Sequence, residues 1–174
     1  MLNFWDSNLQ GDAIDEIKNE IEKIQNPILH SHQTAKDALK MLFRKIESSN
    51  DIYLEIDSEI KQYMEVLKLW DKQGLLSGQR EIQGWVSVYL KDPFFLMAVY
   101  SEKYGNYATL DLHQRVWDII KQEKKIVHGQ NIAENFNVPL PYISALFKIF
   151  ESEGKGETSA EIGSCYYIPD PDLC

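Results

Sequence analysis

Apolar residues near the C-terminus recur at helical spacing in two neighbouring blocks. The first block, residues 132–136, places its apolar side chains on one side and is followed by a turn at Asn137-Val138. Pro139 or Pro141 suits the first turn of a second helix, where a backbone N–H is not needed. The apolar positions of this second helix and the glycine that can end it are Ile143, Leu146, Phe147, Phe150 and Gly154. The pattern predicts helix, tight turn and helix, followed by a short strand at residues 165–168.

The same pattern recurs 80 residues earlier in the chain, where Gly74 stands in place of Gly154. Tyr63, Val66, Leu67, Leu69 and Trp70 match Ile143, Leu146, Phe147, Ile149 and Phe150. After the glycines, Glu81-Ile82 matches Glu161-Ile162, and Val86 and Val88 match Tyr166 and Ile168. Repetition of spacing, helix stop and strand indicates a duplicated unit. The alternative is that any helix followed by a turn and a strand aligns this well, because few of the pairs are identical.

An amphipathic helix is predicted at residues 12–25, with Asp12 as its cap and Asn26-Pro27 as its end. Its isoleucines alternate at spacings of three and four, which is a heptad seam: Ile14, Ile17, Ile21, Ile24 and Ile28. Two heptads are too short for a stable isolated coiled coil. The seam therefore packs either on its own domain or on a second copy or partner.

The elements between these segments follow from the same periodicities. We expect a helix at residues 34–47, with Leu39, Leu42, Phe43 and Ile46 inward, then strand-like alternation at residues 52–56. A single helix from Asp57 or Ser58 to Gln73 follows, and strands lie within residues 83–90. The strongly aromatic segment at residues 94–104 is predicted to form a helix between the two units.

The second unit is expected to begin near Asp111, because Asp111 and Gln114 resemble a capping box. Ile126 and Val127 predict a small first strand, and the tail from Pro169 is expected to fray. The fold class is mostly α with small β wings: two tandem winged-helix units behind an N-terminal amphipathic helix. The expected divisions are residues 1–31, 32–92, 93–108, 109–169 and 170–174.

Composition and charge narrow the functional classes. The 174 residues are 44% hydrophobic, which suffices for a packed core, and the net charge is −9. Residues 1–31 and residues 109–174 each carry −4. This balance disfavours a protein that binds mainly by neutralising phosphates, although local basic patches matter more than the total.

The second helix-turn-helix is poorly equipped to contact bases. The start of its second helix lacks the Arg, Asn and Gln side chains that usually contact bases. We expect its apolar start to be exposed and to bind a protein partner through Leu140, Pro141, Tyr142, Ser144 and Lys148. The alternative DNA-binding residues lie in the first unit: Lys61, Lys68, Lys72 and Arg80. Glu59, Glu65 and Asp71 are interleaved with them.

No reaction chemistry is visible in the sequence. It lacks a G-x-S-x-G, a glycine-rich phosphate loop and an H-E-x-x-H, so we expect no catalytic site and no cofactor. His30 and His32 alone do not make a zinc site. Cys165 and Cys174 are expected to be free thiols of a cytoplasmic protein, since no apolar run is long enough to span a bilayer and no secretory signal is present.

Residues 132–154 resemble the winged-helix branch of the helix-turn-helix superfamily. The whole layout also resembles the tandem winged-helix small subunit of the ESCRT-II membrane-sorting complex, through the junction at residues 88–93 followed by Phe94 and Tyr100. The aromatic-proline N-terminus of that family is absent. These resemblances imply a non-enzymatic assembly subunit that binds other proteins. The alternative is a DNA-binding regulator that acts as a dimer.

Overall fold

The computed structural model describes Asp15, residues 32–161 and residues 164–173. Except for Asp15, the predicted helix at residues 12–25 lies outside the described residues, together with its seam of Ile14, Ile17, Ile21 and Ile24. His30 and Cys174 lie outside them as well. The described part of the chain is mostly helical and contains two small antiparallel sheets, as expected. None of its helices is long and apolar enough to cross a bilayer.

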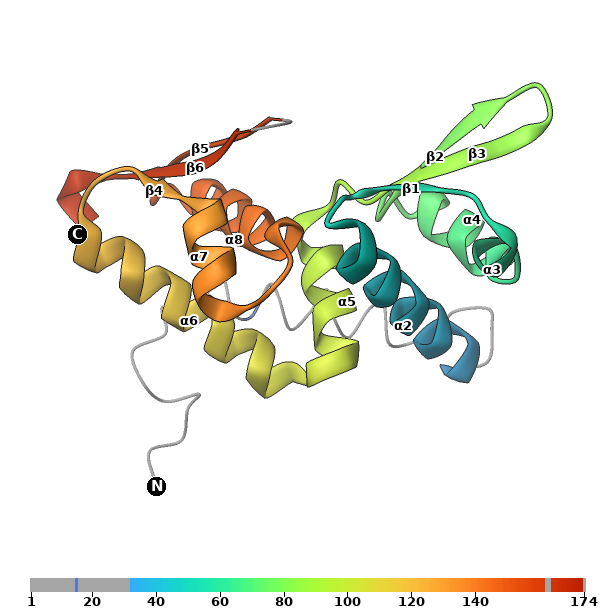
Figure 1. Ribbon diagram of the computed structural model, residues 1–174, viewed down its shortest axis with the longest axis horizontal. Helices are drawn as coiled ribbons and strands as arrows, with labels where there is room; N and C mark the ends of the chain where they lie inside the picture. Colours follow the sequence, from blue (N-terminus) through green and yellow to red (C-terminus); the bar gives the residue numbers. More distant parts are fainter. Residues whose placement is uncertain (1–14, 16–31, 162–163, 174) are drawn as a thin grey trace.

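Two units with the same order of elements follow one another along the chain (Figure 1). The first unit consists of α2 (His32–Ser49), β1 (Tyr53–Glu55), α3 (Ser58–Lys61), α4 (Met64–Lys72), β2 (Ser77–Glu81) and β3 (Gly84–Tyr89). The second consists of α6 (Asn106–Glu123), β4 (Val127–His128), α7 (Gly129–Phe136), α8 (Leu140–Ser152), β5 (Gly156–Glu161) and β6 (Ser164–Pro169). Helix α5 (Pro93–Tyr104) lies between the units, and a short 3₁₀ helix, η1 (Pro171–Leu173), follows β6.

Both sheets have the same topology. The strand orders are β1-β3-β2 and β4-β6-β5, all antiparallel, so the third strand of each unit lies in the middle. Leu54 pairs with Val88 in the first sheet and Val127 with Tyr167 in the second, and all four side chains are buried. The units therefore agree in their packing as well as in the order of their elements.

The predicted glycine stops are equivalent in detail. Gly74 and Gly154 have φ angles of 76° and 73°, a left-handed conformation that favours glycine. One residue further on, the N–H of Leu75 donates to the Trp70 carbonyl at 3.0 Å, and the N–H of Lys155 donates to the Phe150 carbonyl at 3.1 Å. This is the six-residue hydrogen bond of a glycine-ended helix. The 80-residue offset is confirmed up to this point.

Within strand β3 the 80-residue offset between the two units changes. The predicted matches of Val86 with Tyr166 and of Val88 with Ile168 are therefore wrong. Strand β3 carries a bulge, because Gln79 pairs with Ser87 while the next residue, Arg80, pairs with Trp85. Val86 is the extra residue, so beyond it the offset falls to 79. Val88 is therefore equivalent to buried Tyr167, and its predicted match, Ile168, is exposed.

Three predicted boundaries also need correction. The single helix predicted up to Gln73 is broken at Gln62-Tyr63 into α3 and α4. Helix α6 begins at Asn106, and Asp111 is no cap but sits inside the helix, 3.7 Å from Arg115. The tail is held in place, since the N–H of Asp170 donates to the carbonyl of Lys155 at 2.9 Å.

One hydrophobic core joins the units. Helix α5 packs against α2, α6 and α8, and the Phe95 ring meets the Trp70 ring edge-on at 5.3 Å. Trp70 and Phe150, predicted to be equivalent and buried, are 3% and 0% exposed. Phe95 is fully buried, so α5 contributes side chains to the core shared by both units.

Candidate interaction surfaces

The predicted partner-binding surface on α8 is buried, which corrects the sequence-based expectation. Pro141 and Tyr142 are buried, and Leu140, Ser144 and Lys148 are only partly exposed. The Tyr142 ring stacks on Phe43 of α2 at 5.8 Å and meets Tyr100 of α5 edge-on at 5.2 Å. Helices α5 and α2 thus cover the face of α8 that was expected to reach a partner.

A side chain of the first unit also caps the start of α8. The N–H of Leu140 donates to Asn50 Oδ1 at 2.8 Å, while Pro139, the residue at the cap position, makes no side-chain cap. Asn50 follows α2 and has a φ angle of 53°. The sequence predicted a break at Asn50, but it gave no sign that this amide reaches a helix 90 residues away.

The buried hydroxyl of Tyr142 lacks a hydrogen-bond partner among the described residues. Burial raises the pKa of this phenol far above its usual value, and the nearby Glu47 carboxylate adds to the shift. The hydroxyl therefore stays protonated, and the ring, rather than the polar group, makes the contacts.

Helix α4 leaves the equivalent face of the first unit open. Lys68 and Lys72 of α4 and Lys61 at the end of α3 are exposed and form no ion pair among the described residues. Glu65 lies between them and is also exposed. This is the surface on which the DNA-binding alternative depends.

Arg80, the fourth residue of that alternative, is held by its own unit. Its guanidinium lies 3.5 Å from Asp71 Oδ2 and 5.6 Å from the centre of the Trp85 ring. Asp71 Oδ1 also accepts the N–H of Gly78 at 3.1 Å. Arg80 is thus part of the contact between α4 and its hairpin.

The second unit repeats this carboxylate contact at the same offset. Glu151 Oε1 accepts the N–H of Thr158 at 3.2 Å, and residues 151 and 158 are 80 positions beyond Asp71 and Gly78. In both units a carboxylate near the end of the third helix therefore holds the first strand of the hairpin. The sequence shows the acidic residue but not this contact.

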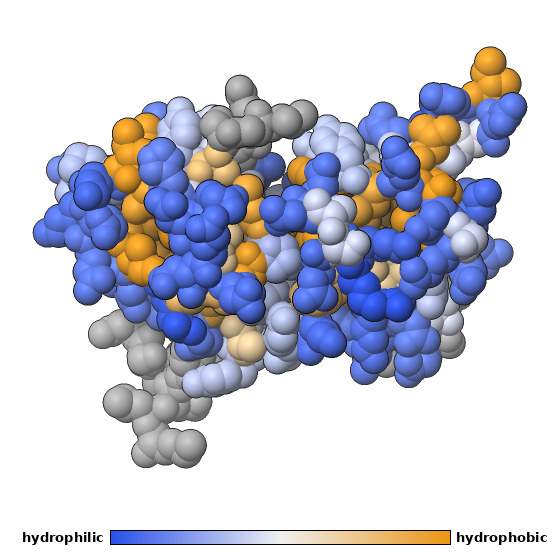
Figure 2. Space-filling view, in the orientation of Figure 1, coloured by the Kyte–Doolittle hydropathy of each residue, from blue (hydrophilic) through white to orange (hydrophobic). Residues whose placement is uncertain are grey.

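The β2–β3 hairpin projects from the molecule and carries apolar side chains near its end (Figures 1 and 2). Ile82, at the turn, is fully exposed, and Val86, the extra residue of the bulge, is 39% exposed. Trp85 packs over Gly78, where an added Cβ would lie 2.5 Å from the ring. The base of the hairpin is therefore fixed while its end is free to contact another molecule.

The solvent-facing side of each sheet carries an apolar pair at an equivalent place. In the first sheet Tyr53 and Tyr89 pair directly and stack in parallel, with ring centres 4.3 Å apart. In the second sheet the matching residues are Ile126 and Ile168, which are 50% and 40% exposed. These pairs lie opposite the buried Leu54–Val88 and Val127–Tyr167 pairs, because strand side chains alternate.

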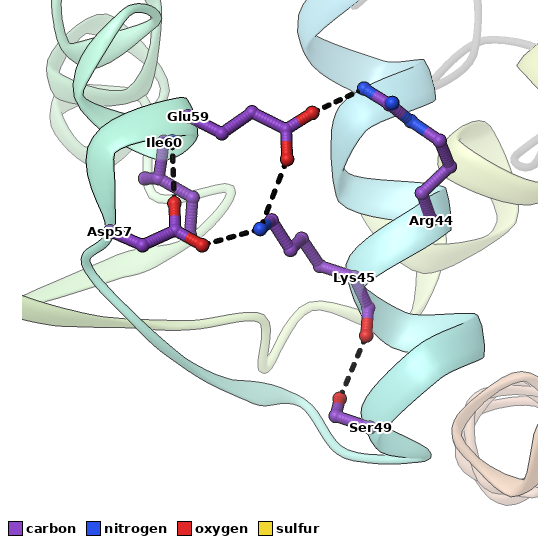
Figure 3. A network of polar contacts seen from close by, with 6 residues as sticks. All are labelled: Arg44, Lys45, Ser49, Asp57, Glu59 and Ile60. Atoms are coloured by element: carbon purple, nitrogen blue, oxygen red, sulfur yellow. Dashed lines mark hydrogen bonds and ion pairs between the residues drawn. The ribbon is translucent and has the colours of Figure 1, made fainter.

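Charged residues also join α2 to α3 (Figure 3). Lys45 Nζ contacts Asp57 and lies 3.0 Å from Glu59 Oε2, while Arg44 reaches Glu59 Oε1. Asp57 also caps α3 by accepting the N–H of Ile60 at 2.8 Å. The Lys45 side chain and this cap lower the pKa of Asp57, so the network stays charged at neutral pH.

Two titratable side chains of the second unit, His113 and Lys155, are buried. His113 is 3% exposed and touches the Phe150 ring edge-on at 4.9 Å. Burial, with a smaller contribution from Lys155, lowers the pKa of His113 to about 4. Lys155 pairs with Glu153 at 2.6 Å and lies 4.8 Å from the centre of the Trp117 ring. His113 is therefore a packed core side chain, and Lys155 and Glu153 form a largely buried ion pair.

Within the described ranges, no three His, Cys, Asp or Glu side chains lie together in a group that could hold a metal ion. Cys165 is a free, half-buried thiol, and burial raises its pKa.

A scan with protein-family models and searches of curated proteins and of solved structures each find nothing similar to this chain. A functional argument therefore rests on the surfaces described above.

Proposed function

We propose that this chain is a non-catalytic assembly protein, built from two winged-helix units, that binds other proteins. The enclosure of α8 carries the proposal. In a DNA-binding winged helix, the second helix of the helix-turn-helix enters the major groove. Here α5 packs on α8, and Tyr142 is fully buried between Tyr100 of α5 and Phe43 of α2.

The order of elements supports the winged-helix assignment. Each unit has a helix, a short strand, two helices in succession and a hairpin, and its first strand pairs with the last. The repeated carboxylate contact to the hairpin is consistent with a duplicated unit. Fold alone does not specify function, so the partner class is argued from the exposed surfaces.

The exposed surfaces favour a protein partner. An isoleucine at a hairpin tip and the apolar pairs on both sheets can be removed from water by another protein, whereas phosphates do not bind them. The partner is expected to contact the β2–β3 hairpin, since Ile82 has no apolar protection within its own unit.

DNA binding by the first unit is the second candidate. The exposed Lys68 and Lys72 on α4 and Lys61 at the end of α3 favour it, but Glu65 lies among them and Arg80 is paired with Asp71. Three phosphate contacts support only weak binding with a shallow dependence on salt.

The test compares capture of a protein with binding of DNA. Tagged chain is used to capture proteins from its native host, alongside Ile82→Asp and the control Gln83→Asp, which adds the same charge beside it. We expect a defined protein to be captured by the wild type and by Gln83→Asp, and to be lost with Ile82→Asp.

Fluorescence anisotropy with random duplex DNA completes the comparison. At physiological salt we expect binding weaker than about 1 μM. Tighter binding with a steep salt dependence, abolished by Lys68→Glu, would overturn the protein-binding proposal and support the DNA-binding candidate.

A further inference from the structure

Two strands in each sheet lie at an edge, where outward N–H and C=O groups can pair with a strand of another molecule. In the orders β1-β3-β2 and β4-β6-β5, these are β1 and β2 in the first unit and β4 and β5 in the second. Strands β1 and β4 contain three and two residues and offer little backbone for pairing. The outer hairpin strands, β2 and β5, contain five and six residues and are the edges long enough to accept an added strand.

The outward backbone groups of β2 belong to Gly78 and Arg80. The N–H of Gly78 points away from β3, because it donates to Asp71 Oδ1 at 3.1 Å. Backbone direction alternates along a strand, so Gln79 faces β3 and the N–H of Arg80 points outward again. The bulge at Val86 lies on β3 and leaves this alternation of β2 unchanged.

The second unit has the same arrangement at the same place. The N–H of Thr158 in β5 donates to Glu151 Oε1 at 3.2 Å, 80 positions beyond the contact in the first unit. In both units a carboxylate of the third helix therefore occupies the place where the carbonyl of an added strand would have to lie. Hydrogen bonds to a carboxylate are roughly twice as strong as those between neutral groups, so a strand carbonyl competes poorly for this N–H.

The other edge of the first sheet also ends on a carboxylate. The N–H of Ile56 donates to the carbonyl of Val86 in β3, so by alternation the N–H of Tyr53 in β1 faces outward. Asp51 Oδ1 accepts this N–H at 3.1 Å. Of the four edges in the described sheets, three thus carry a carboxylate on an outward N–H, and the fourth, β4, has two residues.

An open edge on the first hairpin would favour association. The hairpin projects from the molecule (Figure 1), with Ile82 fully exposed at its turn and Val86 39% exposed. A second copy that paired with β2 could also cover these apolar side chains. Exposed edge strands with apolar side chains are typical sites of aggregation, and proteins commonly place charged groups there to prevent it.

We propose that Asp71 and Glu151 prevent a strand of a second copy of this chain from pairing with β2 and β5. Each carboxylate binds the N–H that such a strand would need, and its helix packs beside the edge strand, since α4 contacts β2 and α8 contacts β5. The two hairpins then meet other molecules through their side chains and not through their backbone. The inference depends on the two sheets and not on the identity of any partner.

The test removes one carboxylate at a time. Asp71→Ala leaves the outward N–H of Gly78 without an acceptor. We expect its sedimentation velocity profile to shift to larger species at concentrations at which the wild type does not shift. Asp71→Asn retains an amide oxygen that can accept this hydrogen bond and should sediment like the wild type. Glu151→Ala and Glu151→Gln repeat the comparison in the second unit.

Matched variants separate the edge from charge and from the loss of the Arg80 ion pair. Glu65→Ala removes an exposed carboxylate from the same helix, and Arg80→Ala breaks the ion pair but leaves Asp71 bound to Gly78. Both should sediment like the wild type. In the Asp71→Ala background, Arg80→Pro removes the next outward N–H and should reverse the shift, whereas Arg80→Ala should not.

Hydrogen exchange measured by NMR tests the contact directly in the wild type. The Gly78 amide should exchange more slowly than the Arg80 amide, because among the described residues only the Gly78 amide is bound by a carboxylate. In Asp71→Ala at low concentration the Gly78 amide should lose this protection. Core amides of α5 should keep theirs, which shows that the fold is intact.

Equal exchange of the Gly78 and Arg80 amides in the wild type would overturn the inference, whether or not the variants fold. So would an unchanged sedimentation profile of folded Asp71→Ala and Glu151→Ala. An equal shift with Glu65→Ala, or a shift that survives Arg80→Pro, would show that association does not use this edge.

Discussion

Single side chains between the units decide how tightly they are joined. Tyr142 contributes an aromatic ring that Phe43 and Tyr100 enclose, but its hydroxyl is buried without a partner. Leaving a polar group unpaired in a core typically costs about 1–3 kcal/mol. The ring stabilises this contact while the hydroxyl weakens it.

Tyr142→Phe should therefore retain or increase stability, by up to about 1 kcal/mol, because it removes only the unpaired hydroxyl. Tyr142→Ala should lower the free energy of unfolding by about 3–5 kcal/mol, because it leaves a cavity between three helices. Urea unfolding of both variants provides the measurement. A loss of more than about 1 kcal/mol with Tyr142→Phe would show that the hydroxyl has a partner.

The burial of His113 predicts that the folded chain loses stability in acid. The pKa of His113 is about 4 in the folded chain and about 6.5 when unfolded, so above pH 6.5 the proton has no effect on folding. As pH falls from 6.5 to 4, the unfolded chain binds a proton that the folded chain does not, and about 3 kcal/mol of stability is lost.

Replacing His113 with Leu should remove this part of the pH dependence, and the exposed His128→Leu is the matched control. Urea unfolding between pH 4 and 7 measures the difference. An identical pH profile for wild type and His113→Leu would show that His113 is not buried in its neutral form.

Among the elements, the positions of the helices were predicted more reliably than the contacts that the helices make with one another. The glycine stops at residues 74 and 154 follow from local backbone chemistry, which the sequence carries directly. The covering of α8 was missed because it depends on α5 and α2, which lie far away in sequence. One signal was available: outside a single polar stripe of Ser144, Lys148 and Glu151, the residues of α8 are almost all apolar, which is more than one buried face requires.

Other misses have equally specific causes. The Val86 bulge adds one residue to a strand without changing its apolar alternation enough to be noticed. Asp111 and Gln114 had the spacing of a cap, but each pairs with a residue one turn further along the same helix. Asn50 was read only as a helix break, because its contact with α8 spans 90 residues.

The cap that Asn50 provides for α8 can be tested at the level of the element. Asn50→Gly keeps the left-handed backbone but loses the acceptor, and should cost about 1 kcal/mol. Asn50→Asp keeps an acceptor at a helix N-terminus and should retain most of the stability. Thermal unfolding of both variants distinguishes the roles, and equal melting temperatures would show that the side chain does not cap α8.

At the scale of the whole molecule, the shared core implies a single cooperative transition. Trp70 and Trp85 report on the first unit and Trp117 on the second, and α5 packs against both. Phe43→Ala in α2 should therefore speed hydrogen exchange in α8 as much as in α4. It should also lower the free energy of unfolding by about 3–5 kcal/mol. Exchange that rises only in α4 would show that the units unfold separately.

The burial of Tyr142 has a consequence during synthesis. Phe43 and Tyr100 leave the ribosome well before the ring that covers them, since Tyr142 follows Tyr100 by about 40 residues. At 5–20 residues per second, the nascent chain presents an uncovered aromatic surface for roughly 2–8 s. During that interval the first unit and α5 are the part of the chain most open to chaperones and to association with neighbouring nascent chains.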